Sequence, residues 1–156
     1  MTRIRVSIVD VYVLKSHGQG QELLLLRRGP GGRCPGSWET VHGHVEETEL
    51  PADAALRELR EETGLVPDRL YNLSRAELFY QHRSNEVSVI PVFAAFVPLE
   101  AEVTLGPEHD ALRWVPVAEG TRRFSWPRER RAVEDLLMLF GSGDAGPVED
   151  VLRVIP

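Results

Sequence analysis

The sequence predicts a single α/β domain, on three observations. The chain has 156 residues, of which 42% are hydrophobic and 27% charged, a balance typical of one globular domain with a buried core. Short runs rich in valine, isoleucine and leucine are separated by turn-forming segments, and two stretches carry apolar residues at helical spacing. We expect one domain over residues 1–156, with its core at about 3–140 and a C-terminal tail at 141–156.

Charge and cysteine content limit the class of partner. The formal net charge is −6, which argues against a surface that binds long nucleic acids. No apolar run approaches the roughly 20 residues of a membrane span, and Cys34 has no second cysteine to pair with. We expect a cytoplasmic protein without a membrane partner. An anionic substrate would need a metal ion or local arginines such as Arg27, Arg28 and Arg33.

The first 41 residues predict strands and loops. Residues 4–14 and 22–27 are apolar runs rich in β-forming side chains, and the turn-forming segment 16–20 between them predicts a hairpin. Residues 29–36 contain four glycines and two prolines and therefore predict a loop, which ends at a short strand over residues 38–41. An irregular loop beside a motif either contacts ligand or is a surface connection.

Residues 51–63 predict an amphipathic helix. Pro51 suits the first helical position and Gly64 suits the C-cap. Leu50 falls at the N-cap and offers no oxygen to the first turn, a loss of about 1 kcal/mol relative to serine or threonine. The apolar stripe repeats at i, i+3, i+4 and i+7. It consists of Ala52, Ala55, Leu56 and Leu59.

The second half predicts a strand pair, a further short strand and a second helix. Residues 70–81 and 86–96 are two long strands joined by a polar turn, with Pro91 marking a bulge or an edge. Residues 112–115 form a short strand, and residues 128–140 carry apolar side chains at helical spacing. Residues 141–147 predict a flexible linker. No role is assigned to residues 148–155.

Three carboxylates share one face of the first helix. At about 100° per residue, Glu58, Glu61 and Glu62 project within an arc of roughly 100°. An isolated cluster of this kind is usually a solvated helix surface. Alternatively, divalent cations bind among the carboxylate oxygens and relieve the repulsion between the three negative charges. Mg2+ is the natural candidate, and Mn2+ could replace it. Arg57 can pair with Glu61 or reach back to Glu49, so its expected role is positional.

The spacing decides between these readings, because residues 43–65 resemble the Nudix box. That family's motif reads G-x5-E-x7-R-E-U-x-E-E-x-G-U, where U is a bulky aliphatic residue. The resemblance implies an α/β/α sandwich around a mixed β-sheet, which is compatible with the predicted order of elements. Every fixed position is present: Gly43, Glu49, Arg57, Glu58, Leu59, Glu61, Glu62, Gly64 and Leu65.

The resemblance also implies a metal site and a mechanism. By analogy Glu58, Glu61 and Glu62 are metal ligands, and Glu58 or Glu61 is also the base for the attacking water. A backbone carbonyl before the box glycine completes the ligands in the family, and here it belongs to His42. Both His42 and Thr48 replace frequent glycines, which leaves the carbonyl available but could alter the loop. Metals held by carboxylates suit hydrolysis of a phosphoanhydride, which needs no covalent nucleophile.

Segments outside the box resemble bacterial nucleoside triphosphate pyrophosphohydrolases of the dihydroneopterin triphosphate and dATP type. This resemblance implies that Glu108 completes the metal site, although an exposed loop carboxylate remains the alternative. Arg27 is a candidate phosphate ligand; the alternative is a solvated surface arginine. Trp38 and Trp126 are candidates for stacking on a base or pterin; the alternative is that they pack in the core or a lid. The histidines do not form a convincing ligand set.

Three functions follow from the resemblance. The first is Mg2+-dependent hydrolysis of a nucleoside triphosphate-like substrate to a monophosphate and pyrophosphate. The second is the same chemistry on a dinucleoside polyphosphate or a nucleotide sugar. The third is a non-catalytic nucleotide-binding module, against which the complete set of box carboxylates argues. The expected partner is thus a small nucleotide-like molecule. The sequence is also compatible with a homodimer.

Overall fold

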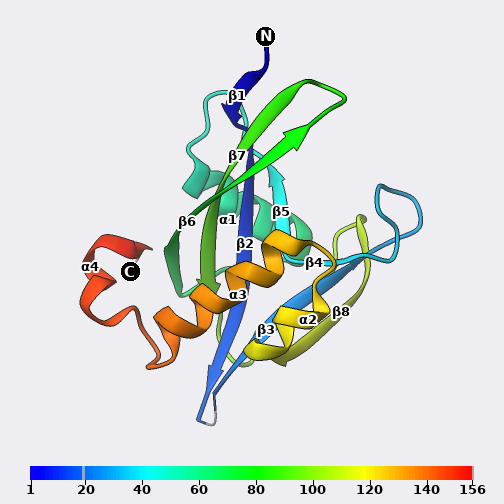
Figure 1. Cartoon of the computed structure of the whole chain (residues 1–156). Helices are drawn as coiled ribbons and strands as arrows, with labels where there is room; N and C mark the ends of the chain where they lie inside the picture. Colours follow the sequence, from blue (N-terminus) through cyan, green and yellow to red (C-terminus); the bar gives the residue numbers. More distant parts are fainter. Residues whose placement is uncertain (19, 156) are drawn as a thin grey trace.

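A nine-stranded mixed sheet is the centre of the fold (Figure 1). The structure is a computed structural model that describes residues 1–18 and 20–155. The strands are β1 (Arg3–Val6), β2 (Ile8–His17), β3 (Gly20–Arg28), β4 (Trp38–Glu39), β5 (Val41–His44), β6 (Arg69–Gln81), β7 (Glu86–Phe96), β8 (His109–Pro116) and β9 (Arg153–Ile155). The helices are α1 (Pro51–Thr63), α2 (Gly120–Arg123), α3 (Pro127–Phe140) and α4 (Glu149–Leu152), with short 3-10 turns at Val117–Glu119 and Gly146–Val148.

Strand β2 organises the sheet because it pairs with three other strands. It runs parallel to β7 on one side. On its other side it pairs antiparallel with β5 near its start, where Val11 lies opposite Val41, and with β3 near its end, where Leu14 lies opposite Leu23. Strand β3 therefore separates from the first half of β2 and continues to β4 and β8. This divergence creates the space in which the pocket described below opens.

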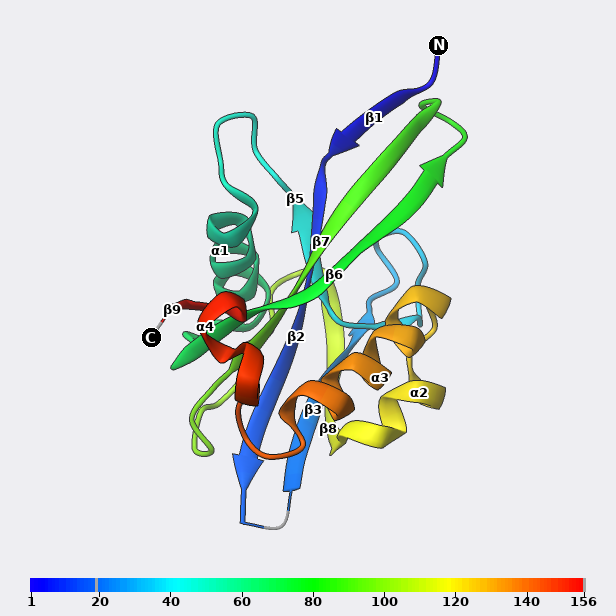
Figure 2. The same cartoon turned by 60° about the vertical axis from the view of Figure 1, so that its left-hand side comes forward.

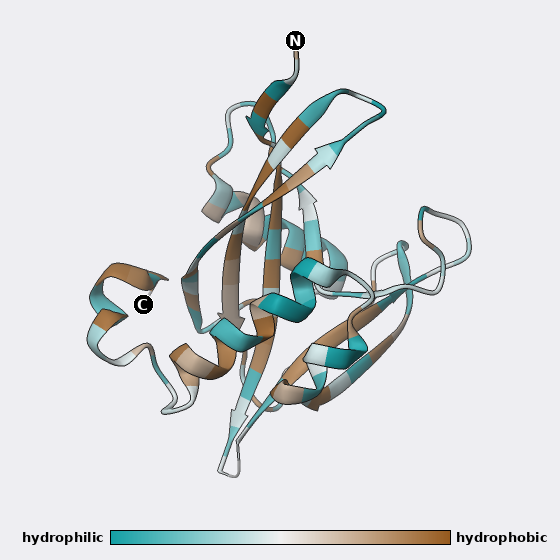
Figure 3. Cartoon of the chain, in the orientation of Figure 1, coloured by the Kyte–Doolittle hydropathy of each residue, from teal (hydrophilic) through white to brown (hydrophobic). Residues whose placement is uncertain are grey.

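The predicted α/β/α sandwich is confirmed. Helix α1 lies on one face of the sheet and α3 on the other (Figure 2). Alternate residues of β2 supply the two cores: Val9, Val11 and Val13 pack with α1, whereas Tyr12 and Leu14 pack with α3, as the period of two in a strand requires. Figure 3 shows that β2 is largely hydrophobic where it lies between the two helices and hydrophilic at its end. None of the described helices has the length and apolar character needed to cross a membrane.

Helix α1 spans the predicted residues, Pro51–Thr63. Leu50 makes no side-chain cap bond, and Gly64 ends the helix in the left-handed conformation at φ 71° while its N–H binds the Arg60 carbonyl. Glycine adopts this conformation without the steric cost that a Cβ would bring. The helix ends at this position because the chain must turn sharply after the last box glutamate.

The two long strands are confirmed as β6 and β7, and a bulge lies in β6 next to the position that pairs with Pro91. Across β6 and β7 the register shifts between Asn72 and Ala76, the latter opposite Pro91. Ser74, in the shifted segment, has φ 57°. Because proline has no N–H to donate, the sheet hydrogen bonds are interrupted here. The break between β1 and β2 lies opposite the same part of β7, so the predicted strand 4–14 is two strands.

Other boundaries differ modestly from the prediction. The strand over 38–41 divides into β4 and β5, and β8 extends on both sides of residues 112–115. The β2–β3 hairpin is present, but residue 19 of its predicted turn lies outside the described residues, as does residue 156 of the predicted tail. Sequence periodicity alone does not locate the ends that depend on pairing with distant strands.

The segment after α3 corrects the prediction of a flexible linker. It returns to the sheet, where β9 pairs with β6 (Figure 2). Ala145 is buried, the Gly143 carbonyl accepts a hydrogen bond from Arg69, and Glu149 accepts one from the Tyr71 hydroxyl at 2.9 Å. The glycine-rich composition therefore indicates turns rather than a free connection, because their partners lie some 70 residues earlier in the chain.

Candidate active site

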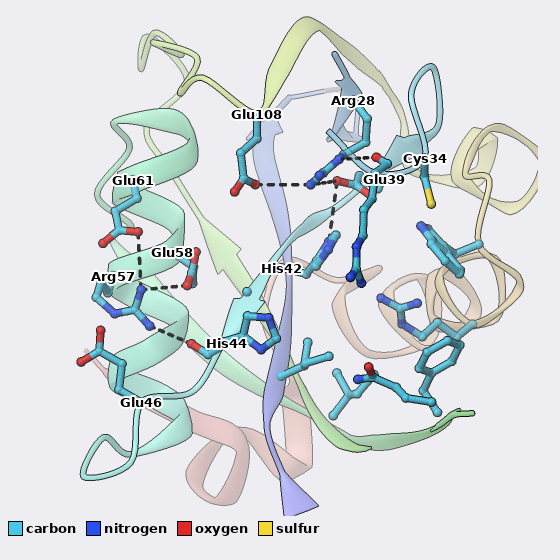
Figure 4. Close-up of a pocket in the computed structure, with 18 residues that line it drawn as sticks. Arg28, Cys34, Glu39, His42, His44, Glu46, Arg57, Glu58, Glu61 and Glu108 are labelled. Atoms are coloured by element: carbon cyan, nitrogen blue, oxygen red, sulfur yellow. Dashed lines mark hydrogen bonds and ion pairs between the residues drawn. The ribbon is translucent and has the colours of Figure 1, made fainter. Parts of the chain in front are cut away.

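A pocket of about 620 Å³ opens between α1, the loop after β3, the β6–β7 hairpin and the start of α3. Figure 4 shows the acidic side chains of α1 on one side and Arg28, Glu39 and His42 facing them. We call Glu58 and Glu61, which line the pocket, together with Glu62 buried behind them, the α1 wall. We call Trp126 and Arg128, which line the pocket, together with Asp10 and Glu129 buried behind them, the α3 wall. Residues lining the pocket include Arg28, Arg33, Cys34, Glu39, His42, Gly43, His44, Arg57, Glu58, Glu61, Phe79, Gln81, Glu108, Trp126 and Arg128.

The α1 wall presents its glutamates at different depths. The Glu58 side chain is 13% exposed and that of Glu61 is 60% exposed. The Glu58 carboxylate lies directly against Gly43 of β5, where an added Cβ would come within 2.0 Å of the carboxylate carbon. A side chain at position 43 would displace the Glu58 carboxylate, so glycine suits this position because of that close approach and not because of its own backbone angle. Burial, reinforced by the charges of Glu61 and Glu108, raises the pKa of Glu58.

Arg57 connects this wall to the preceding loop. Its guanidinium donates to both oxygens of Glu49, at 2.8 and 2.9 Å, and to the His44 carbonyl at 2.8 Å. It also donates to Glu58 at 2.7 Å and reaches Glu61 at 3.5 Å (Figure 4). The hydrogen bond to Glu49 is the main cause that raises the pKa of Arg57, and the same bond lowers the pKa of Glu49. Arg57 thus fixes the loop and two box carboxylates in one arrangement.

Glu62 lies beneath the pocket surface and is buried. Its Oε2 atom has no hydrogen-bond partner among the described residues. Burial, with the negative charges of Glu108, Glu58 and Glu39, raises the pKa of Glu62 to about 10. A buried carboxylate in this state either keeps a proton or needs a cation beside it, because isolated charge is costly in a low-dielectric interior.

Glu108 reaches the α1 wall on a loop that docks against the end of the helix. Thr104 N–H donates to the Thr63 carbonyl at 2.8 Å, and Gly106 N–H donates to the Glu62 carbonyl at 3.0 Å. A Cβ on Gly106 would lie 2.8 Å from the Glu61 carbonyl oxygen, so this approach also requires glycine. The loop satisfies helix-terminal carbonyls that would otherwise lack partners. It thereby brings Glu108 close enough to influence the pKa values of Glu58 and Glu62.

These four carboxylates fit a divalent cation that retains water. The negative charges of their neighbours contribute to the raised pKa values of Glu58 and Glu62, and the buried Oε2 of Glu62 lacks a partner within the described part of the chain. No three of them hold ligand atoms within 4.8 Å of one another in the residues described. Like charges spread apart without a cation, and Mg2+ usually binds through only one or two carboxylates plus waters and phosphates. Oxygen donors of this kind favour Mg2+ or Mn2+.

A tighter cluster lies on the other side of the pocket. Asp10, His42 and Glu129 place ligand atoms within 4.8 Å of one another. Arg128, however, already donates to both oxygens of Asp10, at 2.8 and 3.1 Å. Glu129 accepts the Thr40 N–H at 2.8 Å, and burial raises its pKa strongly. Arg128 therefore occupies the position of a cation in this cluster, and a second cation would be repelled by it.

An aromatic pair completes the α3 wall. Trp126 packs edge-on against Phe79 of the β6–β7 hairpin, with ring centroids 6.2 Å apart. The Arg128 guanidinium lies 5.2 Å from the Trp126 ring centroid. The Trp126 Nε1 atom is buried without a hydrogen-bond partner among the residues described. This end of the pocket thus combines planar apolar surface with an unused donor, features that suit a planar heterocycle.

The structure separates the predicted site residues into two groups. Arg57, Glu58, Glu61, His42, Glu108 and Trp126 line one pocket, and Glu62 lies behind it. Arg27 and Trp38 are not among the lining residues: Arg27 pairs with Asp110 at 2.8 Å, and Trp38 packs against the core under α3. Their role in substrate binding stays a prediction.

Sequence reasoning did not select several residues that the pocket contains. Glu39 is one of these: it follows Trp38 on β4 and is buried beside His109. The sequence indicates Arg28 only as one of three local arginines, next to Arg27, and its side chain lies in the pocket. Alternation along β3 could have separated Arg27 from Arg28, because neighbouring residues point to opposite sides of a strand. No signal in the sequence pairs Asp10 with Arg128, because 118 positions separate them.

Known proteins resemble this chain in sequence and in fold. An octanoyltransferase of Myxococcus xanthus is 36% identical over 133 residues, which are 81% of this chain and 35% of that protein. An asymmetrical bis(5'-nucleosyl)-tetraphosphatase of Mus musculus is 36% identical over 100 residues, which are 63% of this chain and 66% of that protein. The chain thus spans about a third of the first relative and 66% of the second.

The fold has counterparts among solved structures. The E. coli dihydroneopterin triphosphate pyrophosphohydrolase superposes with a TM-score of 0.69 at 22% identity, covering 88% of this chain and 99% of that one. This likeness concerns the fold alone. The NUDIX domain model matches residues 4–136, a range that includes most of β1, strands β2 to β8, the glutamate-bearing helix and most of α3. The chain therefore belongs to the NUDIX family.

Proposed function

We propose that this protein is a metal-dependent hydrolase that cleaves a phosphoanhydride bond of a nucleoside triphosphate-like substrate. The observation that carries the proposal is the α1 wall, where burial and neighbouring carboxylates raise the pKa values of Glu58 and Glu62, and the buried Oε2 of Glu62 lacks a partner among the described residues. Mg2+ is the proposed ion and Mn2+ a substitute. Its ligands are Glu58, Glu61, Glu62, Glu108 and the His42 carbonyl.

The reaction adds water to one phosphorus and breaks the bridging P–O bond, which yields a nucleoside monophosphate and pyrophosphate. Divalent cations at the α1 wall would neutralise charge on the transferred and leaving oxygens. Glu58 or Glu61 accepts the proton of the attacking water; the raised pKa of Glu58 brings it nearer to the working pH. Arg57 holds both carboxylates by hydrogen bonds and keeps their spacing fixed.

The remaining lining residues suit the rest of a nucleotide. Arg28 and Arg33 line the pocket near Glu108 and offer positive charge to phosphates. Trp126 and Phe79 offer aromatic surface to a base or a pterin. Arg27 and Trp38 lie outside this lining, so a role for them requires a substrate long enough to leave the pocket.

A dinucleoside polyphosphate is the second candidate substrate. The 36% identity to the mouse bis(5'-nucleosyl)-tetraphosphatase favours it. The same α1 wall would act on either substrate, because the bond broken is a phosphoanhydride in both. The difference lies in whether the pocket and its rim accept one nucleoside or two.

One substrate panel tests both candidates. Nucleoside triphosphates, dihydroneopterin triphosphate, dinucleoside polyphosphates and nucleotide sugars are incubated with Mg2+ or Mn2+, and products are identified by chromatography. We expect monophosphate and pyrophosphate from a triphosphate. Glu61→Gln should lower kcat by about 10³-fold, equivalent to about 4 kcal/mol of transition-state stabilisation. Inactivity of folded, metal-loaded protein on every compound would indicate a binding module instead.

A further inference from the structure

A chain of buried charged groups connects helix α1 with the loop that carries Glu108. Glu62 Oε2 lies 4.0 Å from His109 Nδ1, and His109 Nε2 lies 2.9 Å from Glu39 Oε1. From Glu39 the chain continues to Arg28 Nη1 at 3.6 Å, and from Arg28 to Glu108 at 3.3 Å. The side chains of Glu62, His109 and Glu39 are 6%, 1% and 2% exposed. We call His109, Glu39 and Arg28 the buried bridge.

The hydrogen bond to Glu39 sets the orientation of the His109 ring. Although burial raises the pKa of Glu39, the bond from His109 and the nearby positive charges hold it below its usual value, so the group is a carboxylate. A carboxylate only accepts, and therefore His109 Nε2 carries the hydrogen and donates it. The opposite nitrogen, Nδ1, faces Glu62 and has no hydrogen-bond partner in the described part of the chain.

Strand pairing places the members of the buried bridge side by side. Strand β3 pairs with β4, where Leu26 lies opposite Glu39, and with β8, where Arg28 lies opposite His109. A register shift between Arg27 and Arg28 leaves Asp110 exposed and turns His109 into the interior. Bulges of this kind re-aim a side chain near functional sites. The bulge is therefore the local feature that directs His109 toward Glu62.

A core histidine with no further role would need a partner on each nitrogen. His109 instead has one nitrogen bonded and the other 4.0 Å from a carboxylate oxygen that also lacks a partner among the residues described. No hydrogen bond joins His109 to Glu62, but the ring, held by its bond to Glu39, fills the space beside Glu62 and so limits where the Glu62 side chain can turn. The arrangement leaves Glu62 free to bind an ion while keeping its carboxylate in place.

We infer that His109, held by Glu39, is a positioning residue for the metal site: it orients Glu62 by packing beside it and, through Glu39 and Arg28, orients Glu108. The inference rests on the proposed function, because Glu62 and Glu108 are proposed ligands. Partners that orient metal ligands typically contribute 10- to 100-fold to metal affinity. The buried bridge should therefore change how tightly the ion binds without contacting the ion itself.

The test measures Mn2+ binding to the full chain by electron paramagnetic resonance of the free ion, without substrate. His109→Leu removes both nitrogens, His109→Gln restores one amide donor near the position of Nε2, and Glu39→Gln removes the charge of the acceptor. We expect about 10- to 100-fold weaker Mn2+ binding for His109→Leu and partial recovery for His109→Gln. Glu86→Gln is the matched control, because Glu86 is also a buried carboxylate with arginine partners but lies outside the pocket.

The outcomes separate the inference from the proposed function. If the wild-type protein binds no Mn2+, the proposed metal site is wrong. If the wild-type protein binds Mn2+ and both His109→Leu and Glu39→Gln bind it equally well, the buried bridge has no positioning role. Thermal unfolding in EDTA identifies folded variants. Should His109→Leu not fold, Glu39→Gln and His109→Gln decide the question by the same titration.

Discussion

The two walls of the pocket both contain buried carboxylates, but they balance the charge differently. In the α3 wall, Arg128 donates to both oxygens of Asp10, and a backbone N–H bonds Glu129. In the α1 wall, Arg57 is shared among Glu49, Glu58 and Glu61, and Glu62 has no cation bonded to it among the described residues. The Asp10–Arg128 ion pair of the α3 wall is thus formed within the protein, whereas Glu62 of the α1 wall must keep a proton or bind a cation.

The largest expected effect on stability comes from breaking the Asp10–Arg128 ion pair of the α3 wall. Arg128→Met leaves Asp10 buried without its partner, and removing one member of a buried ion pair typically costs about 3–5 kcal/mol. Urea unfolding measures the loss. The double variant Asp10→Asn/Arg128→Met should recover part of it, because no uncompensated charge remains. A single variant as stable as the wild type would contradict the comparison.

In the α1 wall, the contribution of Glu62 to stability should depend on pH. Glu62 has a raised pKa of about 10 when folded and a value near 4.5 when unfolded, so folding takes up a proton between these values. Without metal, its contribution to the free energy of unfolding therefore falls as pH rises through this window, by about 1.4 kcal/mol per pH unit.

Glu62→Gln removes this proton uptake. In EDTA, the stability of the variant relative to wild type should increase by up to about 2.7 kcal/mol between pH 6 and pH 8. Parallel urea titrations at the two pH values measure the difference. A constant difference would mean that Glu62 is ionised in the folded protein across the whole range.

The close contact between Gly43 and Glu58 gives a smaller effect. In Gly43→Ala the new Cβ would lie 2.0 Å from the Glu58 carboxylate carbon, so the side chain or β5 must move. Overpacking of this kind costs about 1–3 kcal/mol, and Mn2+ affinity should fall with it. Gly31→Ala is the control, since a Cβ there meets nothing within 4 Å. Equal stability and Mn2+ affinity in both variants would contradict the account of the box glycine.

The smallest effects are expected outside both walls. Arg27 is 43% exposed and pairs with an exposed Asp110, so Arg27→Ala should change stability by less than about 1 kcal/mol. Arg33→Ala, which changes a lining residue, should raise KM by up to about tenfold, and Arg27→Ala should raise it less. Steady-state kinetics on the best substrate of the panel checks this order. A larger rise for Arg27→Ala would show that the substrate extends beyond the pocket.

The sequence by itself determined the α/β class, the helix Pro51–Thr63, both long strands and the acidic face of α1. These features depend on residues three or four positions apart, or on alternation within one strand, and such spacings are visible along the chain. The role of Gly64 as C-cap belongs to the same group, because it depends only on the local turn.

Only the tertiary structure decided what surrounds that acidic face. Arg128 reaches Asp10 across 118 positions, and His109 reaches Glu39 across 70. The return of the C-terminal segment to β6 and the bulge that turns His109 inward likewise depend on pairing between distant strands. Such contacts follow from how strands align and which faces they bury, and no local spacing records them. The glutamates of α1 can therefore be predicted from the sequence, whereas the side chains that hold them in position are identified only in the tertiary structure.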